Sequence, residues 1–148
     1  MYTIVHFEES FLKSIVESFV ESFPSWSNDK AGLYLMQSYM SSPEFCYVCI
    51  GGTNEVLAGI FCKVAPYNQG FSLVIESLQV LKNHRVEGVG SALLQSVIEK
   101  AKEKNITHIS MLAPTHNDFP LSWYRALGFE ESGWVELVAN LNELEIKI

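Results

Sequence analysis

A glycine-bearing turn between an apolar stretch and a helix is the part of this sequence that most directly suggests chemistry. It lies in Val74–Gly90, which reads VIESLQVLKNHRVEGVG, and a patterned helix follows Arg85, Gly88 and Gly90. The first backbone N–H groups of a helix have no partner within the helix, and its dipole favours negative charge there. We therefore interpret the turn as a site for the pyrophosphate of a nucleotide-like cofactor.

Two common nucleotide-binding motifs do not fit this turn. The chain contains no G-x-x-x-x-G-K-[ST] sequence, which excludes a P-loop. The dinucleotide pattern G-x-G-x-x-G also fails, because Leu93 stands where the third glycine is needed. The strands before the turn are predicted to be antiparallel, which further disfavours a dinucleotide-binding domain.

The composition predicts one globular domain over residues 1–148. Hydrophobic residues make up 48% of the chain and charged residues 18%, with no bias towards disorder. The net charge of −7 argues against nucleic-acid and anionic-membrane partners and is compatible with a cationic small substrate. No signal peptide or membrane-length apolar run is visible, so we expect a cytoplasmic protein.

The three cysteines include one pair with metal-like spacing. Cys46 and Cys49 form C-x-x-C inside the apolar run FCYVCI, and Cys62 lies in the next apolar run. No second pair or C-x-x-H partner follows, so we predict core residues and no metal site.

Hydrophobic periodicity predicts an α/β fold of the α+β type with the order βααβββαβαββ. A mixed, mostly antiparallel sheet of about seven strands is flanked by four helices. The predicted strands are Tyr2–Phe7, Phe45–Ile50, Glu55–Val64, Phe71–Leu81, Thr107–Ala113, Phe129–Ala139 and Glu143–Ile148. The predicted helices are Ser10–Phe23, Asn28–Met40, Gly88–Lys104 and Pro120–Leu127.

Two details of this assignment bear on the site. The helix Asn28–Met40 is expected to bury Leu33, Met36 and Met40, and the first helix is expected to be capped by Ser10. The run Phe71–Leu81 is long and apolar on both faces, which predicts a central strand. Strict alternation places Glu76 on the same face as Val74, Leu78 and Val80. A carboxylate in the middle of a buried strand needs a functional or structural partner.

Two motifs on successive elements resemble those of the GNAT-type N-acetyltransferases. Arg85-x-x-Gly88-x-Gly90 is similar to the acetyl-CoA motif of that family, and Asn117-x6-Tyr124-x3-Gly128-Phe129 is similar to its second motif. The element order also matches over almost the whole chain. The sequence departs from the family where Lys82 and Val86 replace a common proline and glycine, Glu87 replaces a frequent basic residue, and Pro120 replaces alanine.

The resemblance implies that acetyl-CoA is a cosubstrate held along one strand and at the turn. The strands ending near Val80 and Ala113 would splay apart and admit the pantetheine arm. The N–H groups of residues 86–91 would then hold the pyrophosphate, and Asn117 would bind the arm or cap the last helix. The cofactor-binding residues implied are Leu78, Gln79, Val80, Arg85, Val86, Glu87, Gly88, Val89, Gly90, Ser91 and Asn117.

Acetyl transfer to an amine requires removal of a proton. An alkyl amine of pKa about 10.4 is only about 0.04% neutral at pH 7. Glu76 is the leading candidate for the base, acting directly or through water. The structural alternative is a carboxylate paired with Arg85, Lys63 or a backbone donor. His84, His108 and His116 are rival bases.

The leaving thiolate needs a proton in turn. The resemblance makes Tyr124 the candidate acid, since phenol and thiol pKa values are close. The alternative for Tyr124 is packing beside Trp123 and Phe129.

The acceptor site is the least legible part of the sequence. The resembling architecture nominates Trp26, Tyr34, Tyr39 and Trp134, although aromatic side chains more often simply pack in the core.

The predicted activity is acetyl transfer from acetyl-CoA to a primary amine of a small molecule, an amino acid or a peptide. A CoA-binding sensor or scaffold and a transferase of larger acyl groups are the alternatives. The half-exposed alternation of Glu143–Ile148 makes a homodimer a further expectation.

Overall fold

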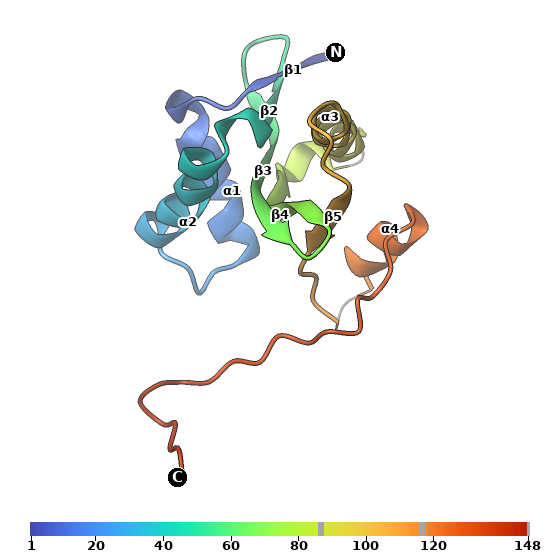
Figure 1. Ribbon diagram of the computed structural model, residues 1–148. Coiled ribbons are helices and arrows are strands. Elements are labelled where there is room, and N and C mark those ends of the chain that lie inside the picture. The colour runs from blue at the N-terminus through green and yellow to red at the C-terminus, as the bar shows by residue number, and fades with distance from the viewer. Residues whose placement is uncertain (86–87, 116–117, 148) are drawn as a thin grey trace. The chain divides into compact units, whose positions relative to one another are not determined.

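The computed structural model describes residues 1–85, 88–115 and 118–147, and its internal contacts divide the chain into two units. Met1–Leu112 is the first unit and Ala113–Ile148 the second, and each is described by itself. Figure 1 labels their elements. The first unit contains β1 (Tyr2–His6), α1 (Leu12–Ser22), α2 (Asn28–Ser41), β2 (Cys46–Gly51), β3 (Val56–Tyr67), β4 (Gly70–Val80), α3 (Val89–Glu103) and β5 (His108–Met111). The second contains α4 (Leu121–Ala126).

A five-stranded sheet forms the centre of the first unit. Its strands follow the order β1-β2-β3-β4-β5. The first four pair antiparallel, and β5 pairs parallel to β4 after the crossover through α3. The prediction of a mixed, mostly antiparallel sheet is confirmed, and the strand that contains Glu76 lies between β3 and β5.

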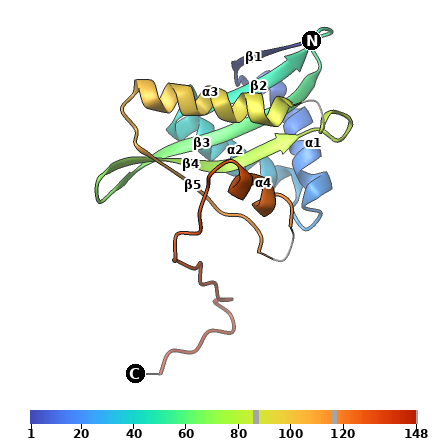
Figure 2. The same cartoon turned by 90° about the vertical axis from the view of Figure 1, so that its right-hand side faces the viewer.

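Helices cover both faces of this sheet. α1 and α2 pack on one face, and α3 crosses the other (Figure 2). One hydrophobic core cluster joins α1 and α2 to the sheet through buried side chains that include Phe7, Ile15, Phe19, Leu35 and Phe61. No helix in the described residues is both long and apolar enough to cross a bilayer.

The caps of the first two helices differ from the prediction, which named Ser10 for the first and Asn28 or Asp29 for the second. Ser10 lies inside a 3-10 turn, Glu9–Phe11, and α1 starts only at Leu12 without a side-chain cap. Ser27 caps α2, because its Oγ accepts a hydrogen bond from the backbone N–H of Lys30 at 3.2 Å. A serine at this position satisfies one of the unpaired N–H groups of the first turn.

The buried stripe of α2 is also displaced from the predicted one. The structure buries Ala31, Leu35 and Ser38, whereas Leu33 and Met40 are 62% and 77% exposed. Positions 31, 35 and 38 share one helical face, and their small side chains at both ends allow close packing. The prediction was therefore wrong for Leu33 and Met40, whereas Met36 is partly buried against the core.

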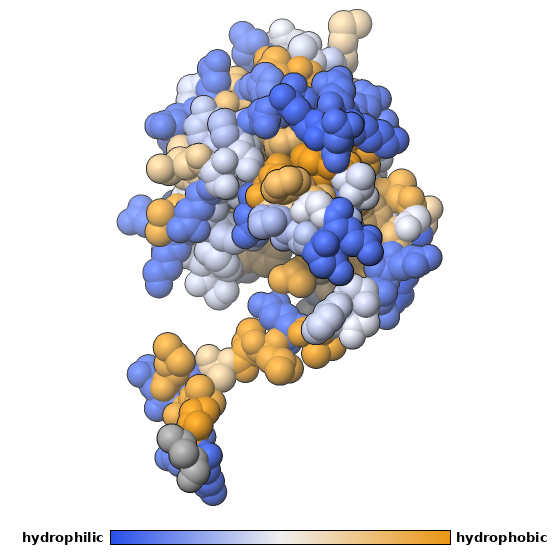
Figure 3. Space-filling view, in the orientation of Figure 1, coloured by the Kyte–Doolittle hydropathy of each residue, from blue (hydrophilic) through white to orange (hydrophobic). Residues whose placement is uncertain are grey.

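The second unit has one short helix and a long extended tail. No strand is assigned in residues 129–147, so the predicted closing strands Phe129–Ala139 and Glu143–Ile148 are not formed there. Apolar side chains along this tail are exposed, as Figure 3 shows; they include Trp134, Val135, Leu137, Val138, Leu141 and Ile146. Alternating sequence suits a strand, but a strand forms only with a hydrogen-bonded partner. The count of about seven strands was therefore too high for the described residues.

Candidate active site

The two halves of β4 have different neighbours. Along its whole length β4 pairs with β3, but it pairs with β5 only over Ser72–Ile75. Within the part of the chain that the structure describes, the edge of residues 76–80 facing β5 carries no ladder. An unpaired strand edge presents backbone N–H and C=O groups that can bind another extended chain. The pantetheine arm of acetyl-CoA is such a chain, so this edge fits the predicted arm site.

Glu76 occupies a β-bulge at the junction of these two halves. Cys62 pairs with Ile75 and the preceding residue Phe61 pairs with Ser77, so the β3–β4 register skips Glu76. A bulge adds one unpaired residue and re-aims its side chain. The local ladder is thereby interrupted exactly where the open edge begins.

This bulge overturns the predicted alternation on β4. Glu76 was expected on the same face as Leu78 and Val80. Instead its carboxylate meets Tyr34 of α2. Val80 lies on the α3 side, where its Cγ2 is 3.3 Å from an ideal Cβ position at Gly90. The extra residue shifts the side-chain period by one, which puts Glu76 and Leu78 on opposite faces.

Three polar contacts hold Glu76 in place. Lys63 Nζ lies 2.6 Å from its Oε1. The Tyr34 hydroxyl donates to its Oε2 at 3.0 Å and lies 2.9 Å from its backbone carbonyl oxygen. The Glu76 side chain is 18% exposed and that of Lys63 is 46% exposed. Of the structural partners considered for Glu76, Lys63 is therefore present, and Tyr34 was missed.

Burial raises the pKa of Tyr34 above its ordinary value, and the hydrogen bond and charge of Glu76 raise it further. The phenol therefore stays protonated and remains a donor through neutral and mildly alkaline pH. Tyr34 also packs against Trp26, with ring centroids 5.3 Å apart. Two predicted acceptor residues thus meet beside Glu76.

The other two predicted acceptor residues have different surroundings. Tyr39 packs edge-on against Phe7 at 5.0 Å and is part of the core packing. Trp134 belongs to the second unit and is 89% exposed.

The start of α3 has the features that an anion site requires. Gly88 is the N-cap with φ 77°, a left-handed conformation that favours glycine. The Ala92 N–H donates to the Gly88 carbonyl at 3.1 Å, so the N–H groups of Val89, Gly90 and Ser91 precede the first helical hydrogen bond. Among the described residues, no atom beyond the chain neighbours lies within 4 Å of a Cβ built on Gly88, which leaves room for a ligand. Val86 and Glu87, also predicted to bind there, lie outside the described residues.

Two predicted cofactor residues use their side chains within the protein. Arg85 donates through Nε to the Val80 carbonyl at 3.3 Å, which ties the turn to the end of β4. The buried Gln79 side chain donates to Ser22 Oγ at 2.9 Å and therefore points towards α1. A cofactor can reach Gln79 only through its backbone.

Tyr124 lies in α4 of the second unit. It is 8% exposed, and its ring meets Phe129 edge-on at 5.5 Å and Trp123 at 4.9 Å. The expected packing partners are therefore both present, and the acid role stays a prediction. Asn117 and His116 lie outside the described residues.

The rival base His108 has structural partners in the paired half of β4. Its Nδ1 is 2.8 Å from Ser72 Oγ, and its ring stacks on Tyr67 at 4.7 Å. The hydrogen bond ties β5 to β4, and the ring stack joins β5 to Tyr67 at the end of β3. His84 lies in the 3-10 turn Lys82–His84 before α3.

The cysteines are core residues, as predicted. All three are buried. Burial raises the pKa of the Cys46 thiol to about 11 and holds that of Cys62 well above its usual range. Protonated thiols are poor metal ligands, and the described residues contain no group of three or more potential metal-binding side chains.

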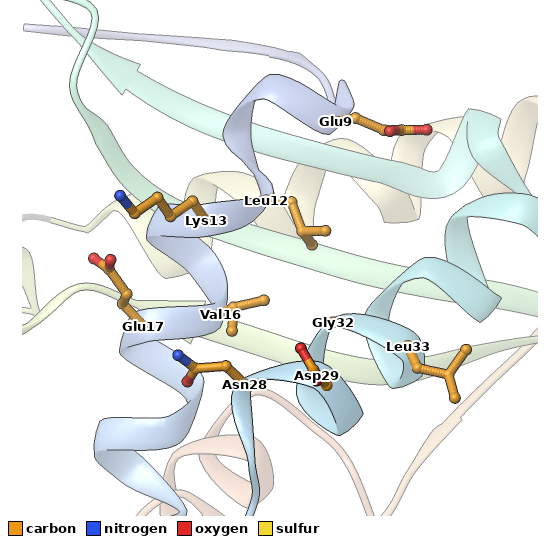
Figure 4. Close-up of a pocket in the computed structure, with 9 residues that line it drawn as sticks. All are labelled: Glu9, Leu12, Lys13, Val16, Glu17, Asn28, Asp29, Gly32 and Leu33. Carbon is orange, nitrogen blue, oxygen red and sulfur yellow. The ribbon is translucent and has the colours of Figure 1, made fainter.

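Two surface hollows flank α1. One of about 460 Å³ lies between α1 and α2 and is lined by Glu9, Leu12, Lys13, Val16, Glu17, Asn28, Asp29, Gly32 and Leu33 (Figure 4). The other, of about 330 Å³, includes Leu81–His84 at the end of β4. None of the residues lining the first hollow is a predicted site residue.

A family comparison agrees with this geometry. The acetyltransferase (GNAT) family matches residues 12–129, which contain β4, the start of α3 and Tyr124. The chain therefore belongs to the GNAT family, whose members are acetyl-CoA-dependent N-acetyltransferases.

Individual relatives support the same assignment. N-alpha-acetyltransferase 30 of Schizosaccharomyces pombe is 24% identical over 131 residues, which are 87% of this chain and 84% of that protein. Arabidopsis thaliana Naa50, solved with the bisubstrate analogue CoA-Ac-MVNAL, has a TM-score of 0.71 and 23% identity over 87% of this chain and 83% of its own. A predicted acetyltransferase from Clostridium acetobutylicum, solved with acetyl-CoA, has a TM-score of 0.73 and 17% identity over 99% of this chain and all of its own. The two structures share the fold of this chain.

Proposed function

We propose that this protein transfers the acetyl group of acetyl-CoA to the terminal α-amine of a peptide, with Glu76 as the general base. The observation that carries the proposal is the bulged carboxylate of Glu76 at the start of the open edge of β4. Bound there, acetyl-CoA supplies an activated thioester carbon. A base at that point lies beside the acetyl donor rather than elsewhere in the core.

Different residues have different proposed roles in binding acetyl-CoA and in transferring its acetyl group. The N–H groups at the start of α3 bind the pyrophosphate, and charge-assisted bonds of this kind contribute about 1.5–3 kcal/mol each. The backbone of Leu78 and Val80 positions the arm. The Tyr34 hydroxyl orients the carboxylate of Glu76, which takes a proton from the amine. Tyr124 is proposed to return a proton to the departing sulfur.

A peptide α-amine suits this machinery better than an alkyl amine. The pKa of an α-amine is about 7.7–8.0 against about 10.4 for a lysine side chain, so far more of it is neutral at pH 7. Less proton removal is therefore required of Glu76, whose carboxylate already contacts Lys63 and Tyr34. The similarity to an N-alpha-acetyltransferase and to Naa50 with a peptide analogue supports this choice.

The test is a thiol-release assay with acetyl-CoA and three acceptor classes: peptides with free α-amines, Nα-blocked lysine peptides and small polyamines. We expect the highest kcat/KM for the free α-amines. Turnover that is highest on polyamines would reject the peptide assignment while keeping the acetyltransferase. Acetyl-CoA binding in a melting assay without turnover on any class would favour a sensor or scaffold.

A further inference from the structure

Lys63 places a primary amine within proton-transfer distance of the Glu76 carboxylate. A general base acts within about 2.6–3.2 Å of the atom whose proton it removes. Lys63 Nζ lies 2.6 Å from Glu76 Oε1. If Glu76 is the base, a primary amine of this chain therefore sits where a substrate amine would be deprotonated.

The surroundings of the pair keep this amine directed at the carboxylate. Tyr34 takes Oε2 and the backbone carbonyl of Glu76, which leaves Oε1 for Lys63. Lys63 lies on β3 opposite Val74, and the next pair, Cys62 with Ile75, borders the bulge at Glu76. Its side chain is 46% exposed, so it lies at the surface rather than in the core. An amine tethered beside a base reacts as though it were present at very high concentration.

We propose that Lys63 is a self-acetylation site of this enzyme, an inference that rests on the proposed role of Glu76. The Lys63 ammonium gives one proton to Glu76, and the neutral Nζ forms a bond to the acetyl carbon of acetyl-CoA. The carbon–sulfur bond breaks, and its electron pair leaves on sulfur. The second proton lost from Nζ ends on that sulfur, giving an acetamide and free CoA thiol. Glu76 returns its proton to solvent.

Acetylation would change the site as well as the lysine. An acetylated lysine carries no charge, so its ion pair with Glu76 is lost. Oε1 then becomes available to the ammonium of an external acceptor. The acetylated protein should therefore bind a cationic acceptor more tightly than the unmodified protein does.

The chain contains a matched internal control in Lys104. Its side chain is 50% exposed, close to the 46% of Lys63, and its Nζ also faces a carboxylate, Glu44, at 3.7 Å. Acetyl-CoA that reacts with exposed lysines without catalysis would label both residues alike. A preference for Lys63 would therefore report catalysis at Glu76.

The test is to incubate the full chain with acetyl-CoA and no acceptor, and to follow site occupancy by peptide mass spectrometry. We expect Lys63 to be acetylated at least about tenfold faster than Lys104, and Glu76→Gln to remove that preference. Equal rates at the two lysines would overturn the proposal. An unmodified Lys63 in protein that acetylates external amines would overturn it too, and the proposed function would survive. If the protein acetylates neither Lys63 nor an external amine, the proposed function itself is rejected.

Two substitutions of Lys63 test the release of Glu76 without requiring modification. Lys63→Arg keeps a cation beside Glu76, whereas Lys63→Gln resembles the acetylated side chain. We expect the acceptor KM of Lys63→Gln to be at least about threefold below that of Lys63→Arg, with similar melting temperatures. Equal KM values in two folded variants would contradict the release of Glu76.

Discussion

The polar residues in the two halves of β4 make different kinds of contact. In the paired half, Ser72 bonds His108 across the parallel ladder to β5. In the open half, the contacts to Glu76 among the described residues come from β3 and α2, through Lys63 and Tyr34. Within the described residues, the first cluster joins two strands and the second lies beside an edge without a ladder.

The difference separates groups that hold the fold from groups that can react. Ser72 is 5% exposed and takes part in inter-strand contacts that a substrate would have to break. Glu76 keeps part of its surface exposed, and the backbone after it has an open edge. A carboxylate in that position is oriented by its neighbours and can still be reached by a ligand.

The largest expected effect comes from exchanging the reactive group of the open half. Glu76→Gln keeps the shape but removes the base, and we expect kcat/KM to fall about a hundredfold at neutral pH. The pH optimum should move upward, because neutral amine must then come from solution. Steady-state pH profiles measure both. Ser72→Ala in the paired half is the control and should retain wild-type kcat/KM; an equal loss in both variants would erase the distinction between the halves.

Tyr124→Phe should have the next largest effect. Loss of the proposed acid should lower kcat at least about tenfold, with acetyl-CoA affinity near normal, because a thiolate then leaves without its proton donor. Tyr67→Phe provides a matched control, since Tyr67 stacks on His108 in the paired half. Turnover and calorimetric binding would be measured on both proteins. Unchanged kcat in Tyr124→Phe would reject the acid role and leave packing as the role of this residue.

Gly88→Ala tests the proposed anion site at the start of α3. At φ 77° an alanine costs about 1–2 kcal/mol, so acetyl-CoA should bind about fivefold or more weakly. Gly52→Ala in the β2–β3 hairpin is the control, because no atom lies within 4 Å of its added Cβ. Isothermal titration with acetyl-CoA gives both dissociation constants. Equal affinities would argue against a role for this turn in binding.

The smallest effect concerns Tyr34 and pH. Its pKa is raised in the folded protein, so the unfolded chain ionises first, near pH 10. The stability gained from the neutral phenol is therefore present below about pH 10 and declines above it. Melting curves at pH 8 and pH 11 should show a larger alkaline loss in wild type than in Tyr34→Phe. Identical losses would mean that burial and Glu76 together do not hold Tyr34 protonated.

Much of the fold could be predicted from sequence, because its signals are local. Apolar periodicity and turn residues predicted β1 to β5 and the crossover through α3 to within a few residues. The tail after Gly128 could not be predicted in this way. Its alternation is typical of strands, but whether a strand forms depends on a partner that the tail's own sequence does not specify.

The site was predicted in part for the same reason. A buried-strand carboxylate and a glycine-bearing helix start are visible as residue types, so Glu76 and Gly88 could be nominated from the sequence, and their roles stay predictions. The bulge was not, because no glycine or proline marks it and strict alternation hides the extra residue. Tyr34 was nominated only as an acceptor contact. Its hydrogen bond to Glu76 joins residues 42 positions apart, which periodicity does not reveal.

Binding of acetyl-CoA along the backbone of the open half of β4 can be measured by amide hydrogen exchange, residue by residue, with and without acetyl-CoA. We expect acetyl-CoA to slow exchange within residues 76–80 and at Val89, Gly90 and Ser91, and to leave residues 72–75 unchanged. Binding of acetyl-CoA without any slowing in residues 76–80 would show that this strand edge does not hold the cofactor.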